Sequence, residues 1–101
     1  MKLLRIREQV GEFAENKDAA RALREEFLRP ELTLGHDVIV DFEAVDLATQ
    51  SFVHALISDL VRDEDIKALD HLIFRSCNPD VKTIISIVVD YSQEDVAASD
   101  L

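Results

Sequence analysis

The sequence is poor in glycine, proline and cysteine, and it contains no tryptophan. It has 2 glycines, 2 prolines and 1 cysteine in 101 residues. A single cysteine excludes an internal disulfide and a zinc site built from several thiolates. The scarcity of glycine leaves no glycine-rich phosphate loop and no glycine elbow around a nucleophile. These absences argue against nucleotide-binding and hydrolase functions, and we expect no cofactor.

Positive charge is also scarce. The chain has 11 Lys and Arg against 21 Asp and Glu, which gives a formal net charge of −10 at pH 7. Nucleic acid or an anionic membrane surface would meet an excess of like charge, so we expect neither as a partner. The N-terminal MKLLRIREQV is unlike a signal peptide, and no apolar run is long enough to cross a bilayer. We expect a cytoplasmic protein, and a protein partner with a basic face would fit this charge.

The rest of the composition is that of a folded protein. Hydrophobic residues make up 48% and charged residues 32% of the chain. A length of 101 residues supports one domain with a modest core. We expect that domain to span residues 1–91, and we expect residues 92–101 to form a disordered acidic tail.

Segments typical of strands and helices alternate along the chain. The expected strands are residues 2–8 (at an edge), 37–42 (central and covered on both faces) and 71–76. The first expected helix is capped by Asn16 and stopped by Pro30, and the second spans residues 49–62. Residues 11–17 and 63–70 are expected to be loops. This alternation predicts a small α/β domain with a mainly parallel or mixed sheet packed on helices.

One segment carries conflicting signals. DVKTIISIVVDY, residues 80–91, is rich in β-branched residues, which favour a strand. It follows Asn78 and Pro79, however, and these are a helix cap and a residue suited to the first helical position. We predict a helix over residues 79–90.

A candidate site lies where the central strand gives way to the second long helix. The segment VIVDFEAVDLATQSFVHAL, residues 38–56, places Thr49, Gln50 and Ser51 at the expected helix start. Hydroxyls in a first turn lie near unpaired backbone N–H groups and the positive end of the helix dipole, where a phosphate would be stabilised. Alternatively, Thr49 or Ser51 merely caps the helix.

Residues 38–60, VIVDFEAVDLATQSFVHALISDL, resemble the central segment of STAS domains, the fold of bacterial anti-sigma-factor antagonists. They resemble more closely a STAS-like family of unknown function, in which a strand ending in Asp-Phe precedes a short turn and a Ser-Phe helix start. The order of elements agrees over about residues 1–91. In the antagonists a partner kinase phosphorylates the serine at this helix start, and Ser51 falls on that position. The antagonists usually carry Asp-Ser-Ser-Gly there, whereas this chain has Thr49 to Phe52.

The resemblance implies a small STAS-like domain that binds a protein partner and performs no catalysis. It implies a signalling or regulatory module, with a kinase-like ATPase as one class of partner. Ser51 is the candidate phosphorylation site. The expected partner-binding residues are Asp46, Thr49, Gln50, Ser51 and His54. The alternatives are a structural or assembly subunit without a switch, or a small nucleotide-binding protein or enzyme.

Other polar residues favour structural roles. The pair of Ser51 and His54 lacks the loop that a hydrolase needs to stabilise an oxyanion. His36 and His71 have no further ligands at metal-binding spacing. Cys77 follows an apolar segment and is expected at the edge of the core.

The carboxylates of Asp41, Glu43 and Asp46 offer two interpretations. They could hold Mg²⁺ beside a phosphorylated aspartate at the end of a strand, or form a solvated acidic turn, and we favour the acidic turn. For the switch at Ser51, Ser58 lies two turns further along the helix, and aspartate there is expected to have a smaller effect on binding.

Overall fold

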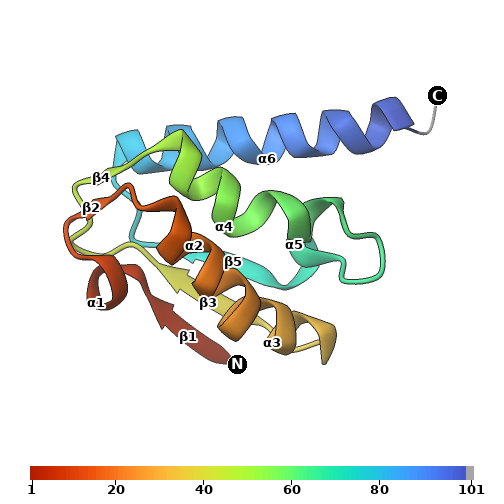
Figure 1. Ribbon diagram of the computed structural model, residues 1–101, viewed down its shortest axis with the longest axis horizontal. Helices are drawn as coiled ribbons and strands as arrows, with labels where there is room; N and C mark the ends of the chain where they lie inside the picture. The colour runs from red at the N-terminus through yellow and green to blue at the C-terminus, as the bar shows by residue number, and fades with distance from the viewer. Residues whose placement is uncertain (100–101) are drawn as a thin grey trace.

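Three parallel strands form the central sheet of the computed structural model, and helices α2, α4 and α6 lie on one side of it (Figure 1). The structure describes the backbone of residues 1–99 and the side chains of residues 1–93. The strands of this sheet are β1 (Lys2–Arg5), β3 (Val38–Asp41) and β5 (Leu72–Arg75). Their order is β1-β3-β5, which confirms the prediction of a central strand at residues 37–42 and an edge strand near the N-terminus.

The two faces of the sheet differ in burial. Leu4, Val38 and Val40 point toward the helices and are at most 2% exposed. On the opposite face, Leu3 and Ile73 are 40% and 42% exposed. Ile39 lies between these two in the register and is half-buried. The expectation that the central strand is fully covered on both faces is therefore only partly met.

The first long helical segment continues past the proline that was expected to stop it. It comprises α2 (Lys17–Leu23), the π-helical turn η1 (Arg24–Leu28) and α3 (Arg29–Thr33). In an α-helix the ring of Pro30 would collide with a carbonyl four residues back. In the wider turn the Arg29 amide instead donates to the Arg24 carbonyl, five residues back. Pro30 then occupies the first turn of α3, where no N–H is required of it.

The starts of two helices match the sequence prediction. Asn16 accepts hydrogen bonds from the Asp18 and Ala19 amides at 2.9 and 3.1 Å, so it caps α2. Asn78 accepts from the Val81 amide at 2.8 Å and caps α6 (Pro79–Ser99). The local start signal thus prevails over the β-branched composition of residues 80–91. Helix α4 (Gln50–Arg62) also agrees with the prediction.

The structure contains short helices and strands that were not predicted from the sequence. Residues 6–8 belong to helix α1 (Ile6–Val10) rather than to the first strand, and α5 (Ala68–His71) lies within the expected loop 63–70. The expected connector 11–17 contains β2 (Phe13–Ala14), which pairs in parallel with β4 (Leu47–Ala48). The Thr49 amide continues this pairing by donating to the Ala14 carbonyl at 2.9 Å. We call this pair of short strands the β2–β4 ribbon. Because α2 and α4 each begin shortly after one of its strands, the β2–β4 ribbon places the starts of the two helices beside each other.

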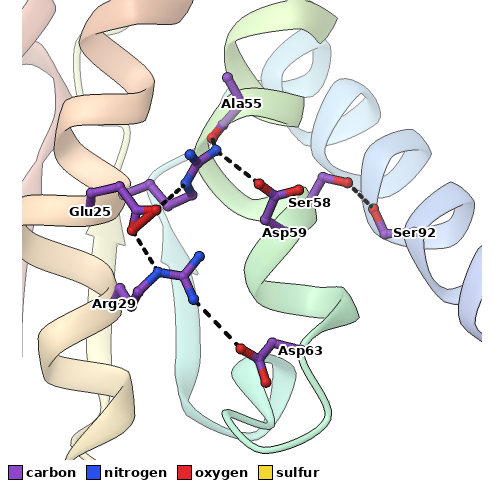
Figure 2. A network of polar contacts seen from close by, with 8 residues as sticks. Glu25, Arg29, Ala55, Ser58, Asp59, Asp63 and Ser92 are labelled. Carbon is purple, nitrogen blue, oxygen red and sulfur yellow. Dashed lines mark hydrogen bonds and ion pairs between the residues drawn. The ribbon is translucent and has the colours of Figure 1, made fainter.

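Helix α4 is the centre of the core. It packs against α2 on one side and α6 on the other. Its fully buried residues include Phe52, Leu56, Ile57 and Leu60. Ser58 is also 0% exposed, and its hydroxyl lies 3.1 Å from that of Ser92 on α6 (Figure 2).

The C-terminal boundary of the domain stays a prediction. Helix α6 continues through Ser99, and Ser92 is buried although it belongs to the expected tail 92–101. Residues 100–101 of that tail lie outside the described residues. Within the part of the chain that the structure describes, no helix combines the length and apolar character needed to span a bilayer.

Candidate functional site

At the start of α4, the residue that caps the helix is not Ser51. The side chain of Thr49 accepts a hydrogen bond from the Phe52 amide at 3.1 Å, so Thr49 is the cap. Ser51 is the second residue of the helix and is exposed. Its hydroxyl has no hydrogen-bond partner among the described residues. The side chain of Ser51 is therefore not needed to begin the helix.

Ser51 borders a shallow groove between α2 and α4. The groove has a volume of about 610 Å³. One wall is formed by Gln50, Ser51 and His54 of α4. The other wall carries three cations in a chain of net charge −10: Lys17, Arg21 and Arg24. The groove thus brings together three of the predicted partner-binding residues and places them opposite positive charge.

Arg24 is the least exposed of the three cations that line this groove. Its side chain is only 14% exposed, and its Nη1 donates to the Ala55 carbonyl at 2.8 Å. The same guanidinium lies 3.4 Å from the Asp59 carboxylate and 3.6 Å from that of Glu25. Two of its neighbours, Ala55 and Asp59, come from α4 (Figure 2). Arg24 is therefore held in place and largely neutralised.

A second arginine extends the contact between the two helical segments. Nε of Arg29 donates to Glu25 at 2.6 Å, and its Nη1 lies 3.5 Å from Asp63 at the end of α4 (Figure 2). The hydrogen bond from Arg29 holds the pKa of Glu25 below its usual value, with the charges of Arg29 and Arg24 acting in the same direction. The network fixes how α2, η1 and α3 lie along α4.

The contacts of Arg24 and Arg29 with α4 show where the other two cations, Lys17 and Arg21, lie along that helix. Arg24 is opposite Ala55 and Asp59, and Arg29 is opposite Asp63, so the two helical segments run in the same direction. Arg21 is one turn earlier than Arg24 and therefore lies opposite the first turn of α4. It is paired with Asp18 at 3.3 Å, in a contact where both side chains are more than half exposed. Lys17 forms no ion pair among the described residues.

The acidic turn after β3 differs from the expected solvated turn. Asp41 is 2% exposed, whereas Glu43 and Asp46 are exposed. The carboxylate of Asp41 accepts from Nη2 of Arg75 and from the Glu43 amide, each at 2.9 Å. Burial alone would raise the pKa of Asp41, but these two hydrogen bonds and the charge of Arg75 outweigh it and lower the pKa. The solvated interpretation is thus wrong for Asp41, because β5 brings Arg75 beside it.

We expect Asp41→Asn to reduce the free energy of unfolding by about 1–2 kcal/mol at pH 7, the usual range for losing a charged hydrogen bond to a half-exposed arginine. The folded-state pKa of Asp41 lies below the unfolded value of about 3.9, so its contribution is complete above that value. It is lost as the pH falls through the folded-state pKa. Urea unfolding between pH 7 and pH 3 should show the two proteins converging in acid, whereas the exposed Asp46→Asn control should stay near wild type throughout.

Asp46 and Thr49 do not line the groove, although they were predicted to share the partner surface. The Asp46 carbonyl accepts from Nδ2 of Asn78 at 3.0 Å, and the Val45 carbonyl accepts from the same nitrogen at 3.2 Å. The side-chain amide of Asn78, which caps α6, thereby also fixes the turn after β3. Asp46 is exposed at the surface beside this contact.

The other candidate residues have structural partners. His36 lies 2.7 Å from Glu31, and His71 lies 2.8 Å from Asp37. Among the side chains that the structure describes, no three His, Cys, Asp or Glu residues are grouped closely enough to hold a metal ion. Burial raises the pKa of the Cys77 thiol, and the charge of Asp41 raises it further, which opposes thiolate reactivity.

The sequence reasoning missed Lys17 and Arg21 as site residues. Lys17, Arg21 and Arg24 are spaced as one stripe of a helix, and this spacing is the signal that could have found them. It could not show that the stripe faces Ser51. That follows from the β2–β4 ribbon and from the contacts of Arg24 with α4.

A family model described as a STAS-like domain of unknown function matches residues 19–82. No curated protein and no solved structure matches the chain significantly. The matched region includes β3, α4, β5 and two of the three cations of the groove. The parallel sheet and alternating helices agree with this match. The chain therefore belongs to the family of STAS-like domains of unknown function.

Proposed function

We propose that this domain is a non-catalytic regulatory module that binds a protein partner through the groove between α2 and α4, with Ser51 as its phosphorylation site. The observation that carries the proposal is the exposed Ser51 hydroxyl beside a cationic groove, with Thr49 performing the capping. A hydroxyl without a structural task is accessible to a modifying enzyme. Although the net charge of the chain favours a partner with a basic face, Lys17 and Arg21 in this groove offer contacts to acidic groups of a partner.

The partner that modifies Ser51 would be a kinase-like ATPase. In that reaction Oγ of Ser51 forms a bond to the γ-phosphorus of a nucleoside triphosphate held by the partner. The bond from that phosphorus to the bridging oxygen breaks, and the nucleoside diphosphate leaves. The hydroxyl proton passes to a base of the partner, and all catalytic groups belong to the partner.

Ser51→Asp is expected to weaken partner binding about tenfold or more, and Ser51→Ala is expected to leave it unchanged. The added carboxylate must be desolvated where the partner covers it, and a cost of about 1.4 kcal/mol corresponds to tenfold. The partner can be obtained by co-purification with the native protein, and its affinity for each variant measured by calorimetry. Mass spectrometry of a peptide covering residues 48–56 tests for the phosphate itself.

The matched control for this comparison is Ser86→Asp. Ser86 is exposed on α6 and does not line the groove, so its substitution adds the same charge elsewhere. Ser58 does not serve as the control, because it is buried between α4 and α6. Equal affinity of wild type, Ser51→Ala and Ser51→Asp would contradict the switch and favour an assembly subunit without one.

A further inference from the structure

We propose that a phosphate on Ser51 is held within the same molecule, by Lys17 and Arg21 of α2 across the groove. The contact itself rests on the proposed function only in taking Ser51 as the modified residue, whereas its effect on binding also rests on the partner using this groove. It adds a mechanism: phosphorylation neutralises and fills the groove that the partner would use. The binding surface is then lost through occupation by the domain's own phosphate, in addition to any repulsion of the partner.

The three cations of the groove are not equivalent. Arg24 has its guanidinium committed to Ala55, Asp59 and Glu25 and is 14% exposed. Lys17 and Arg21 are exposed, and the one ion pair of Arg21 among the described residues is with the highly exposed Asp18. An exposed pair of this kind contributes little, so a doubly charged phosphate competes effectively with a single carboxylate for Arg21. Lys17 and Arg21 are therefore the cations that can turn toward a phosphate.

The fold places these two side chains on the groove that Ser51 borders. The β2–β4 ribbon sets the starts of α2 and α4 side by side, and Lys17 is the first residue of α2. The contacts of Arg24 with Ala55 and Asp59 set Arg21 opposite the first turn of α4. Both side chains line the groove together with Ser51. Long flexible cations on one wall and a hydroxyl on the other form a site that a phosphate would complete.

Other charges near the groove act less directly. His54 and Asp59 line the same groove from α4, and Asp18 flanks Arg21. Asp59 is turned toward Arg24 at 3.4 Å, so its charge is already balanced. The N-terminus of the 13-residue helix α4 adds a favourable dipole for a phosphate at Ser51. The contribution of Lys17 and Arg21 must therefore be measured as a difference between proteins that share all the other groups.

The test uses the full chain with phosphoserine installed at position 51 during synthesis, so that no kinase or partner is required. The second pKa of phosphoserine, ordinarily about 6, is measured by ³¹P NMR titration. We expect it to be lower in the otherwise wild-type protein than in the Lys17→Gln/Arg21→Gln variant by about 0.5–1 pH unit, since nearby cations favour the dianion. In 1 M salt this difference should shrink, because exposed charges are screened.

The matched control is the Lys2→Gln/Lys67→Gln variant. It removes the same number of charges from exposed positions outside the groove, and its phosphoserine pKa should equal that of the wild-type background. Equal pKa values in the wild-type and Lys17→Gln/Arg21→Gln backgrounds would overturn the intramolecular contact. The proposed switch would survive that result if Ser51→Asp still weakened partner binding. Conversely, a lowered pKa with no effect of Ser51→Asp on the partner would support the contact and contradict the switch.

Discussion

Ser58→Asp is expected to lower the free energy of unfolding by about 3–5 kcal/mol at pH 7, because it places a charge at a fully buried position. Ser58 and Ser92 are both 0% exposed, and a single hydrogen bond of 3.1 Å joins their hydroxyls across the contact between α4 and α6. When the Ser92 hydroxyl donates its one proton to the Val88 carbonyl at 2.8 Å, it accepts the proton of Ser58. A carboxylate at position 58 would be placed at this buried contact, beside the neutral hydroxyl of Ser92.

Urea denaturation of Ser58→Asp at pH 7 and pH 4 measures this effect. The buried acid has a raised pKa in the folded state, so protonation in acid reduces the cost and the gap to wild type should narrow. Ser58→Ala removes one neutral hydrogen bond and should cost about 1 kcal/mol at both pH values. Ser86→Asp adds the same charge at an exposed position of α6, and its free energy of unfolding should stay within about 0.5 kcal/mol of the wild-type value. A stable Ser58→Asp protein would mean that α4 and α6 do not pack as described.

The features that could be predicted from the sequence are those encoded locally. Asn78 and Pro79 supply a cap and a fixed backbone angle, so the helix that follows could be predicted despite its β-branched residues. Residues 38–41 form a continuous apolar run that closes on one Asp, which is typical of a buried parallel strand. Thr49 capped α4 as one of two possible caps, and only the structure distinguished it from Ser51.

The features that could not be predicted depend on partners distant in sequence. Strands of two residues, such as Phe13–Ala14, are too short to show a period, and they exist because Leu47–Ala48 pairs with them. Asp41 is buried because Arg75, 34 residues away, supplies its counter-charge. Pro30 is tolerated because the preceding turn is π-helical, with a hydrogen bond between residues five apart in the sequence. The cationic wall of the groove likewise depends on how α2 lies along α4.

Phe52 links the candidate site to the core. Its backbone amide is the one that Thr49 caps, and its side chain is 0% exposed. The residue therefore holds the first turn of α4 against the core while Ser51, its neighbour, points to the groove. A change at Phe52 should disturb the position of Ser51 through loss of packing, with no direct effect on the charges of the site.

We expect Phe52→Ala to lower the free energy of unfolding by about 3–5 kcal/mol, because the substitution removes buried contacts and leaves a cavity. For a domain of this size that is a large part of the total stability. Phe13→Ala is the matched control: it makes the same chemical change at a side chain that is 55% exposed, and it should cost less than about 1 kcal/mol. Urea unfolding followed by circular dichroism measures both. Similar losses for the two variants would contradict the placement of Phe52 at the centre of the core, and with it the assignment of Ser51 to the exposed side of α4.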